Sequence, residues 1–293
     1  MKVIIFGFIL DKSFIEYFDK MLSILERGKA ELYIHKSLYE HLNGEHKKII
    51  DNKHLVISKS SEIAGKADFI FSIGGDGTFL KASLLLADYN TPVVGINSGR
   101  LGFLSSISKL DIEDEIIKIL NGNFELEERS MLELISDNIS LDEKKYAINE
   151  VTVAKTDSSS MINVHVSING EHLNTFWADG LIISTPTGST GYSLSVGGPI
   201  ISPDCKCFVI SPIAPHSLTV RPIVIPDNSE IEIKVDGRTN KYLIALDSRS
   251  DQVDIHYTFK LRKSPQTIKT VRLDNRSFFS NLREKLNWGK IKS

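Results

Sequence analysis

A glycine-rich turn with a single carboxylate is the part of the sequence best suited to chemistry. The motif Gly-Gly-Asp-Gly-Thr occupies residues 74–78 and follows the apolar stretch 68–73 directly. Glycines let backbone N–H groups approach a phosphate closely, and a helix start adds free donors and a positive dipole end. The turn therefore favours an anion, and Gly74, Gly75 and Thr78 are the candidate phosphate contacts.

Asp76 lies in the middle of this turn, where its charge would repel a bound phosphate. A carboxylate is useful there if it takes the proton of an attacking hydroxyl or holds a cation, both of which are roles in phosphoryl transfer. The structural alternative is a tight turn in which Asp76 caps a helix. The Walker pattern Gly-x4-Gly-Lys-Ser/Thr is absent. Lys81 follows on the predicted helix, where it either reaches a phosphate or remains solvated.

Three further segments suit a nucleotide. Residues 178–199 are dense in Thr, Ser and Gly, and such a run is either a ligand-binding loop or a simple turn-rich connection. Asn149 and Glu150 could clamp vicinal ribose hydroxyls, or one of them could be the solvent side of a strand. A strand at residues 92–96 runs into a Gly-rich bend that ends in Phe103, which could stack on a base or belong to the core.

The elements that must position these residues change character along the chain. Before residue 122, apolar strand patterns alternate with helical periodicity, which predicts a mostly parallel sheet with helices on both faces. After residue 124, short β-rich segments separated by Gly, Pro, Asn, Asp and Ser predict a β-rich domain. The predicted strands are 2–10, 31–35, 68–73, 92–96, 131–135, 146–155, 162–168, 181–185, 208–211, 231–235, 242–246 and 267–273. The predicted helical segments are 13–27, 37–43 (ended by Gly44), 79–87, 112–120 and 277–286.

The predicted fold class is thus an α/β N-terminal domain with a mostly parallel sheet, followed by a β-rich C-terminal domain. The predicted boundaries are 1–122, 123–274 and a C-terminal helix at 275–293 that packs back on the first domain. Ligands of open parallel sheets sit at the carboxyl ends of the strands. The Asp76 turn and the Phe103 bend are therefore expected at the same edge.

Composition excludes several classes of protein. The 293 residues carry 35 Lys and Arg against 37 Asp and Glu, a net charge of −2, which argues against a general nucleic-acid binder. The longest apolar run, Val3–Leu10, is too short to span a bilayer and lacks a signal-peptide cleavage site. Cys205 and Cys207 cannot form a disulfide framework, which suggests a reducing cytoplasm. We expect both cysteines to be ordinary residues of a strand that do not bind a metal.

Together and in this order, the motifs resemble those of the NAD kinase family, and the resemblance runs through most of the chain. It includes the segments 74–78, 95–103, 149–150, 179–190 and 212–222. Related glycine-aspartate turns also occur in diacylglycerol and sphingosine kinases and in phosphofructokinases. The Thr-Pro-Thr-Gly-Ser-Thr segment combined with Asn-Glu is much more specific to NAD kinases.

The resemblance implies transfer of the γ-phosphoryl group of ATP, which carries Mg²⁺, to the 2′-hydroxyl of the adenosine ribose of NAD. Asp76 would be the general base, Phe103 would lie by the adenine, and Asp179 would contact the nicotinamide half. The substrate-binding residues would be Gly77, Lys81, Phe103, Asn149, Glu150, Asp179, Thr187, Thr190, Gly191, Tyr192 and Ser195. The family implies a site between the two domains and a homodimer or homotetramer. From the composition, we expect a cytoplasmic protein without membrane or nucleic-acid partners.

Two positions depart from the family pattern, and two alternative functions stay open. Gly191 stands where the family often has Ala, which leaves more space near the base. Asp247-Ser248-Arg249 replaces the family's Asp-Gly-Gln, and Arg249 could offer a cation to a phosphate. One alternative is a lipid kinase that uses the same turn. The other is an NAD-binding sensor without chemistry, which would be expected to lack Asp76. The choice between ATP and polyphosphate as donor also stays open.

Overall fold

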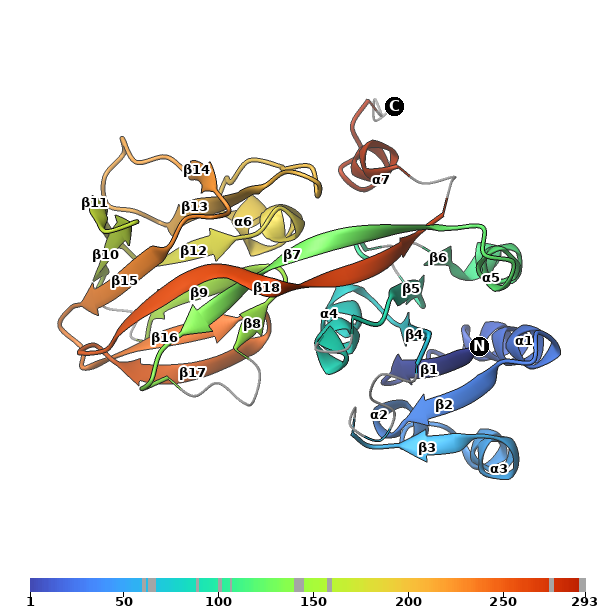
Figure 1. The fold of residues 1–293 in the computed structure, drawn as a ribbon. Coiled ribbons are helices and arrows are strands. Elements are labelled where there is room, and N and C mark those ends of the chain that lie inside the picture. Colours follow the sequence, from blue (N-terminus) through green and yellow to red (C-terminus); the bar gives the residue numbers. More distant parts are fainter. Residues whose placement is uncertain are drawn as a thin grey trace. The chain divides into compact units, whose positions relative to one another are not determined.

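The computed structural model describes residues 1–59, 62, 67–87, 90–99, 102–105, 107–139, 145–156, 160–273 and 277–289. The chain divides into two compact units (Figure 1). Unit 1 comprises Met1–Glu128 and Ile268–Ser293, and unit 2 comprises Arg129–Thr267. Strands β7 (Glu125–Ile135) and β18 (Thr258–Arg272) contribute residues to both units.

Unit 1 is an α/β unit built on a parallel sheet, as predicted. Its strands are β1 (Lys2–Gly7), β2 (Glu31–His35), β3 (Leu55–Ile57), β4 (Phe69–Ile73), β5 (Val93–Asn97) and β6 (Ile107–Ser108). Its helices are α1 (Ile15–Arg27), α2 (Lys36–Tyr39), α3 (Gly44–Lys53), α4 (Asp76–Leu85), α5 (Ile112–Leu120) and α7 (Phe278–Lys285), with a 3₁₀ turn at Lys109–Asp111.

The order of the strands places the glycine-aspartate turn at a topological switch point. The sheet runs β3-β2-β1-β4-β5, and β6 and the end of β18 also pair in parallel with β5. The chain therefore leaves β1 toward β2 and β3 and then returns to place β4 on the other side of β1. Crevices at such points, outside the carboxyl ends of the strands, are the usual ligand sites of open parallel sheets. β1 ends there at Gly7, and β4 runs there into the turn.

Helices cover both faces of this sheet (Figure 1). On one face, Val3 and Ile5 of β1 belong to a buried cluster that also contains the apolar sides of α1 and α5. On the other face, α4 lies over β4 and β5, and a Cβ added at Gly95 of β5 would lie 3.0 Å from the ring of Phe79 in α4. This packing fixes the start of α4 at the carboxyl edge of the sheet.

One local prediction in unit 1 is wrong. The sequence pattern places a helical turn at residues 37–43 that Gly44 ends, whereas α2 is shorter and Gly44 is the first residue of α3. Asn43 is the N-cap, and its side-chain oxygen accepts the His46 N–H at 2.9 Å. The Asn43 side chain satisfies a backbone N–H group in the first turn of α3 that would otherwise lack a partner. Gly44, which follows this capping residue, therefore begins a helix and does not end one.

Unit 2 consists of two antiparallel sheets around one core, apart from short helical turns. Its other strands are β8 (Tyr146–Ala147), β9 (Glu150–Lys155), β10 (Ile162–Ile168), β11 (Glu171–Ala178), β12 (Gly180–Ser184), β13 (Cys207–Ile213), β14 (Ile223–Pro226), β15 (Ile231–Asp236), β16 (Lys241–Leu246) and β17 (Arg249–Asp254). One sheet has the order β14-β13-β12-β9-β16-β17, and the other contains β11, β10, β15, β18, β7 and β8. Inward side chains of both sheets form one buried cluster. The predicted β-rich domain is confirmed.

The predicted strand at residues 146–155 is in fact interrupted. β8 ends at Ala147 and β9 begins at Glu150, so Asn149 lies in the break and not within a strand. Cys207 begins β13, whereas Cys205 lies before the strand and is exposed.

Tyr242 gives a test of the packing in unit 2. Its side chain is completely buried beside Phe259, and its hydroxyl finds no hydrogen-bond partner among the described residues. A buried polar group without a partner costs stability, so Tyr242→Phe is expected to raise the free energy of unfolding by about 1 kcal/mol. Urea unfolding measures the change. Tyr39→Phe is the control, because the Tyr39 hydroxyl donates to Asp51 at 2.9 Å; an equal gain there would contradict the explanation.

Candidate functional site

The glycine-aspartate turn joins the carboxyl end of β4 to α4. Gly75 is the N-cap of α4, and its carbonyl oxygen accepts the Thr78 and Phe79 N–H groups at 3.0 and 3.1 Å. Gly74 has a φ of 153°, and a Cβ there would lie 2.4 Å from the Thr78 hydroxyl oxygen. A Cβ at Gly75 or Gly77 would meet no described atom within 4 Å. Internal packing therefore explains Gly74, while the space beside Gly75 and Gly77 is open for a ligand to approach the backbone.

Asp76 does not cap its own helix, because its carboxylate bonds to the bend after β5. Its Oδ2 accepts the Phe103 N–H at 2.7 Å, and its Oδ1 accepts the Leu104 and Ser105 N–H groups at 2.9 and 3.2 Å. The structure thus brings the turn and the Phe103 bend together, as their places at the strand ends indicate. Residues 100 and 101 of this bend lie outside the described residues.

Glycine at position 102 is required by this arrangement. A Cβ there would lie 1.9 Å from Oδ1 of Asp76, which is an impossible distance. A carboxylate oxygen accepts about two hydrogen bonds. From the described residues, Oδ1 accepts two hydrogen bonds, whereas Oδ2 accepts one. Oδ2 is therefore the better placed oxygen to accept a hydrogen bond from an incoming hydroxyl.

Two other predicted site residues of unit 1, Phe103 and Lys81, take part in contacts between a lysine ammonium and an aromatic ring. The ring of half-buried Phe103 lies under the ammonium of Lys285, 4.3 Å from the ring centroid. Lys81 is exposed on α4, and its ammonium lies 4.9 Å from the centroid of the Phe8 ring.

In unit 2, the break between β8 and β9 is held by a carboxylate from far along the chain. Asp247 lies in the two-residue turn between β16 and β17 with a φ of 52°. Its oxygens accept the N–H groups of Ile148, Asn149 and Glu150 at 2.9, 2.8 and 3.2 Å. Asp247 therefore satisfies the backbone donors at the point where the strand is interrupted, and it fixes the position of the Asn-Glu pair.

Asn149 and Glu150 each present a buried oxygen without a partner among the described residues. These atoms are Asn149 Oδ1 and Glu150 Oε2. A Cβ at Gly191 would lie 3.0 Å from Glu150 Oε2 and 3.3 Å from Asn149 Nδ2, so Gly191 packs directly against the pair. Native proteins rarely leave buried acceptors unsatisfied. The two oxygens are therefore candidates for accepting hydrogen bonds from a ligand's hydroxyl or amino groups.

The environment of Glu150 favours its neutral form. Burial, followed by the negative charge of Asp247, raises the pKa of Glu150 to about 7, although a hydrogen bond from the Tyr192 N–H acts in the opposite direction. Burial also raises the pKa of Asp247, against the three backbone donors and the charge of Arg249.

The polar run after β12 forms helical turns that pack on the Asn-Glu pair. Thr187–Thr190 is a 3₁₀ turn and Tyr192–Ser195 is the short helix α6. Gly188 sits so close to Asn149 that a Cβ would lie 2.1 Å from the Asn149 carbonyl oxygen. Within these turns Thr187 is buried, whereas Tyr192 and Ser195 are exposed and the Thr190 hydroxyl donates to the Thr187 carbonyl oxygen at 3.3 Å.

The remaining predicted residue of unit 2, Asp179, is paired with a lysine. It lies between β11 and β12, and Lys155 Nζ is 2.6 Å from its carboxylate.

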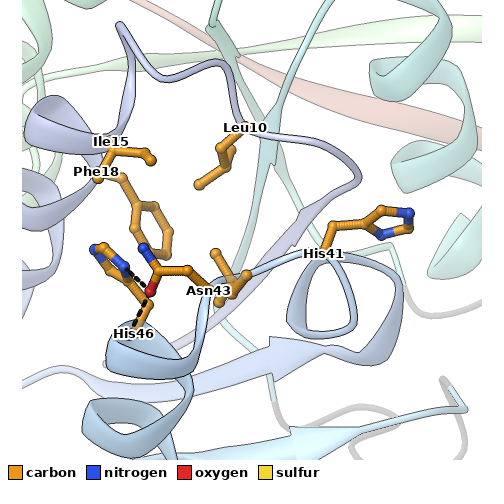
Figure 2. Close-up of a pocket in the computed structure, with 7 residues that line it drawn as sticks. Leu10, Ile15, Phe18, His41, Asn43 and His46 are labelled. Carbon is orange, nitrogen blue, oxygen red and sulfur yellow. Dashed lines mark hydrogen bonds between the residues drawn. The ribbon is translucent and has the colours of Figure 1, made fainter.

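Two other polar clusters of unit 1 form internal hydrogen bonds, although His35 Nε2 in the second is buried without a partner among the described residues. A small pocket of about 90 Å³ is lined by Leu10, Ile15, Phe18, His41, Leu42, Asn43 and His46 (Figure 2). Its His46 ring lies 2.7 Å from Asn43 Oδ1 and 2.9 Å from Asp19 Oδ1. Pockets that hold cofactors or drug-sized ligands usually have about 300–1,000 Å³, so this one is small for a nucleotide.

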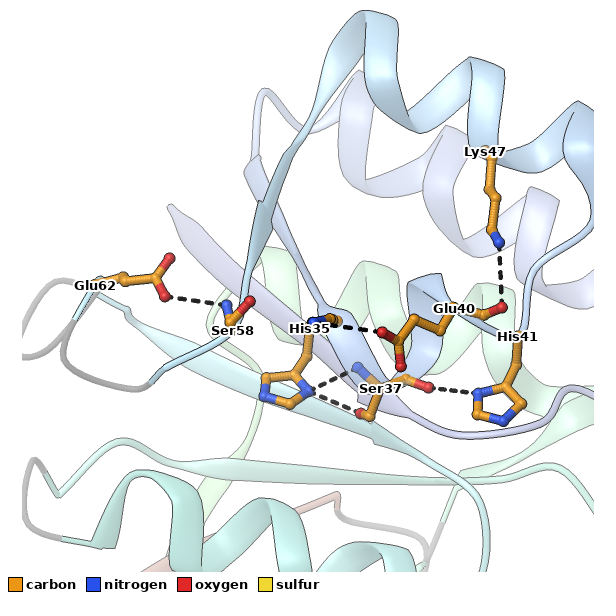
Figure 3. A network of polar contacts seen from close by, with 8 residues as sticks. His35, Ser37, Glu40, His41, Lys47, Ser58 and Glu62 are labelled. Carbon is orange, nitrogen blue, oxygen red and sulfur yellow. Dashed lines mark hydrogen bonds and ion pairs between the residues drawn. The ribbon is translucent and has the colours of Figure 1, made fainter.

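The second cluster surrounds His35 at the carboxyl end of β2 (Figure 3). The Ser37 hydroxyl lies 2.7 Å from His35 Nδ1 and donates to the Gly7 carbonyl oxygen at 2.7 Å. Burial lowers the pKa of His35. The cluster ties the ends of β1 and β2 together, and we assign it a structural role.

Comparisons with known proteins decide the family. A family model described as the ATP-NAD kinase N-terminal domain matches residues 3–124, and one described as the ATP-NAD kinase C-terminal domain matches residues 148–273. The chain belongs to the NAD kinase family. The NAD kinases of Bacteroides fragilis and Cytophaga hutchinsonii are 42% and 41% identical to it over 289 and 275 residues. These matches cover 99% and 94% of this chain, and 98% and 94% of those proteins.

Solved structures of NAD kinases share the fold. An NAD kinase from Archaeoglobus fulgidus, solved in complex with ATP, superposes with a TM-score of 0.76 at 26% identity and covers 98% of this chain and 99% of that one. Yeast NADH kinase, solved with NADH, superposes with a TM-score of 0.86 over 100% of this chain and 89% of that one. Its identity is 23%, so it supports the fold alone.

The structure shows what surrounds the two positions that depart from the NAD kinase pattern. Gly191 leaves less room than the sequence suggests, because an added methyl group would press on Glu150 and Asn149 at 3.0 and 3.3 Å. The Arg249 guanidinium donates to the Tyr146 carbonyl oxygen, and its charge lowers the pKa of Asp247. Arg249 therefore stabilises the hairpin that carries Asp247.

In this NAD kinase family member, the described residues contain no group of three or more His, Cys, Asp or Glu side chains arranged to hold a metal ion. None of the described helices is long and apolar enough to cross a membrane.

The sequence motif contains Asp247, but its role in accepting the N–H groups at the break between β8 and β9 was not predicted. The signal that could have found it is the Asp-Ser pair between two β-rich segments, which is typical of a tight hairpin turn.

Glu150 gives a prediction for the dependence of stability on pH. Its pKa is about 7 in the folded protein against 4.5 for a free side chain, so the folded state binds the extra proton between these values. The contribution of Glu150 to stability therefore falls as the pH rises from 4.5 to 7. Glu150→Gln removes this cost and is expected to raise the free energy of unfolding by up to about 3 kcal/mol above pH 7, with no gain below pH 4.

Chemical denaturation of the nucleotide-free protein at a series of pH values measures this gain. The exposed Glu45 supplies a control variant, Glu45→Gln, because its side chain carries no burial cost for Gln to remove. A gain that is the same at every pH would mean that Glu150 is not ionised at a cost in the folded protein.

Proposed function

We propose that the chain is an NAD kinase, which transfers the γ-phosphoryl group of ATP to the 2′-hydroxyl of the adenosine ribose of NAD and releases NADP and ADP. The substrates are MgATP and NAD. The observation that carries the proposal is the carboxylate of Asp76, which the backbone of a second loop holds at the switch point of a parallel sheet. The relatives named NAD kinase, similar along the whole chain, support the choice of reaction.

Asp76 is the proposed general base. A ribose hydroxyl is a weak nucleophile, and a positioned carboxylate contributes about 10²–10⁴-fold to such a reaction. The better placed Asp76 oxygen, Oδ2, would accept the hydroxyl proton. Gly74, Gly75 and Thr78 would contact the phosphates of ATP at the start of α4, where free N–H groups and the helix dipole favour an anion. Positioning and the Mg²⁺ charge supply the rest of the acceleration.

Unit 2 supplies most of the proposed contacts to NAD, and Gly77, Lys81 and Phe103 of unit 1 supply the others. Asn149 and Glu150 would accept hydrogen bonds from the ribose and the adenine amino group, because their buried oxygens lack partners among the described residues. The helical turns that pack on the pair and the residues named with them complete the proposed set: Gly77, Lys81, Phe103, Asp179, Thr187, Thr190, Gly191, Tyr192 and Ser195. For Asp179, binding would require the carboxylate to share its charge between the ligand and Lys155.

Three further properties are part of the proposal. They are a cytoplasmic location, a homodimeric or homotetrameric assembly, and the assignment of ATP chemistry to residues 1–122 and NAD binding to residues 123–274. Family membership supports each of them.

Incubation with NAD and MgATP, coupled to a dehydrogenase that accepts only NADP, tests the proposal directly. We expect NADP to form in amounts equal to ADP. Replacing ATP with polyphosphate identifies the donor. Transfer of the γ-phosphoryl group of ATP to a lipid alcohol, with ADP released and no NADP formed, would favour the lipid kinase. Tight NAD binding without turnover would favour the sensor.

Asn149→Ala tests the contact between unit 2 and NAD. The variant removes a side chain whose amide oxygen is buried and without a described partner, so a ligand donor would lose its acceptor. We expect the KM for NAD to rise about tenfold, corresponding to one hydrogen bond of roughly 1.4 kcal/mol, while the KM for ATP changes little. Asn163→Ala is the control, because that amide pairs with Asp236 at 2.7 Å. An unchanged KM for NAD would rule out a role of Asn149 in binding NAD.

A further inference from the structure

The C-terminal helix α7 reaches the bend that binds Asp76. The helix begins after Ser277, whose hydroxyl accepts the Ser280 N–H at 3.1 Å, and Leu282 anchors it with a side chain only 3% exposed. Lys285 lies in the last turn, and its Nζ is 4.3 Å from the centroid of the Phe103 ring. The Nζ atom itself is buried. Helix and bend belong to the same unit of the fold.

The contact with Lys285 restrains the side chain of Phe103, whose backbone N–H is bound by Asp76. A cation over an aromatic ring is attracted by the negative face of the ring, and the attraction grows when the cation is removed from water. The N–H group of the same residue, Phe103, donates to Oδ2 of Asp76 at 2.7 Å. Lys285 therefore restrains the side chain of Phe103 while Asp76 binds its backbone.

The bend supplies the hydrogen bonds that hold the carboxylate. Among the described residues, the three donors to Asp76 are consecutive N–H groups, those of Phe103, Leu104 and Ser105. If the bend moved, Asp76 would lose all three donors together and could rotate about its side-chain bonds. The direction in which Oδ2 points thus depends on the bend.

We propose that Lys285 is a positioning residue for phosphoryl transfer. By holding the ring of Phe103, it keeps three backbone N–H groups in place, and these keep the Asp76 carboxylate aimed at the acceptor hydroxyl. The proposal rests on the proposed function of Asp76 as the general base. Lys285 acts through Phe103 and does not itself touch the reacting atoms. Because one face of the ring is covered by the ammonium, an adenine that stacks on Phe103 must use the other face.

Three variants separate the charge of Lys285 from its bulk. Lys285→Met keeps a long apolar side chain and removes the cation, whereas Lys285→Arg keeps a cation that can stack on the ring. Lys47→Met is the matched control, since Lys47 Nζ lies 5.3 Å from the ring centroid of Tyr39 on a different part of the unit. Lys285→Gln is a second uncharged variant in case the Met variant does not fold, and circular dichroism verifies the fold of each.

Two measurements are made on each full-length variant. The first is kcat with the KM values for NAD and ATP. The second is hydrogen–deuterium exchange of the segment 102–105 in the protein without substrates. For Lys285→Met we expect a fall in kcat of about tenfold, with both KM values nearly unchanged and faster exchange of the segment. Lys285→Arg and Lys47→Met are expected to match the wild-type protein in both measurements.

Each other outcome overturns the proposal in a recognisable way. Unchanged exchange in Lys285→Met would show that Lys285 does not hold the bend. Faster exchange with an unchanged kcat would show that the bend does not position Asp76. An effect on the KM for NAD alone would make Lys285 part of the binding surface. A wild-type chain that forms no NADP would instead refute the proposed function, and the exchange data would still report whether the contact exists.

Discussion

Asp76→Asn is expected to reduce kcat by about 10²–10⁴-fold or more, because the amide cannot take the proton of the ribose hydroxyl. NAD binding should remain mostly intact, since the proposed contacts to NAD lie largely on other residues. Steady-state kinetics with the coupled assay and titration calorimetry with NAD measure the two quantities. Turnover close to that of the wild-type protein would defeat the assignment of Asp76 as the base.

The same variant should also lose some stability, and this loss needs a control. The Asn oxygen can still accept from Leu104 and Ser105, but its NH₂ group would then face the Phe103 N–H, and two donors repel. The expected cost is about 1–3 kcal/mol. Asp68→Asn is the control, because the Asp68 carboxylate accepts the exposed Lys2 N–H at 2.6 Å in the same unit, a bond that the Asn oxygen can keep. It should cost less stability than Asp76→Asn and leave kcat unchanged.

Gly102→Ala is expected to produce the second large loss of activity. The new methyl carbon would lie 1.9 Å from Asp76 Oδ1, so either the carboxylate or the bend must move. The flexible side chain is the easier of the two to displace, and a displacement of about 1 Å in a positioned catalytic group can cost about 10²-fold in rate. We therefore expect kcat to fall by about 10²-fold, with a smaller change in the KM for ATP.

Gly99→Ala is the control for this prediction, because it lies in the same bend and a Cβ there would meet no described atom within 4 Å. The double variant Asp76→Asn/Gly102→Ala adds a sharper test. If Gly102 matters only by making room for the carboxylate, the double variant should be no slower than Asp76→Asn alone. Losses that multiply would show that Gly102 serves another purpose.

The fold was predictable where the local pattern is strong. The helix predicted at residues 112–120 is α5 with the same bounds, because Ile112, Ile116 and Ile119 recur at helical spacing and are buried. Helix α3 was missed because only His46 and Ile50 of its ten residues are buried, which leaves no apolar stripe to read. Strand β11 was missed too, although Asn169-Gly170 before it is a strong hairpin signal.

The candidate site was predictable in its residue types but not in its contacts. The Asp76 turn and the Phe103 bend could be placed at one edge from the order of strands alone. The bonds from Asp76 to residues 27–29 positions later could not, since they depend on how two loops meet. The break in the strand at Asn149 could not be predicted either, because the Asn149 N–H donates to Asp247, 98 positions away. A local pattern holds no information on such distant partners.

The close approach of Asp76 to Gly102 has a consequence for evolution within the family. The glycine is needed because the carboxylate occupies the space of its missing side chain. A lineage that abandoned catalysis and lost this acid would be released from the constraint, and larger residues would become acceptable at position 102. Covariation of the two positions would therefore distinguish inactive descendants from working enzymes.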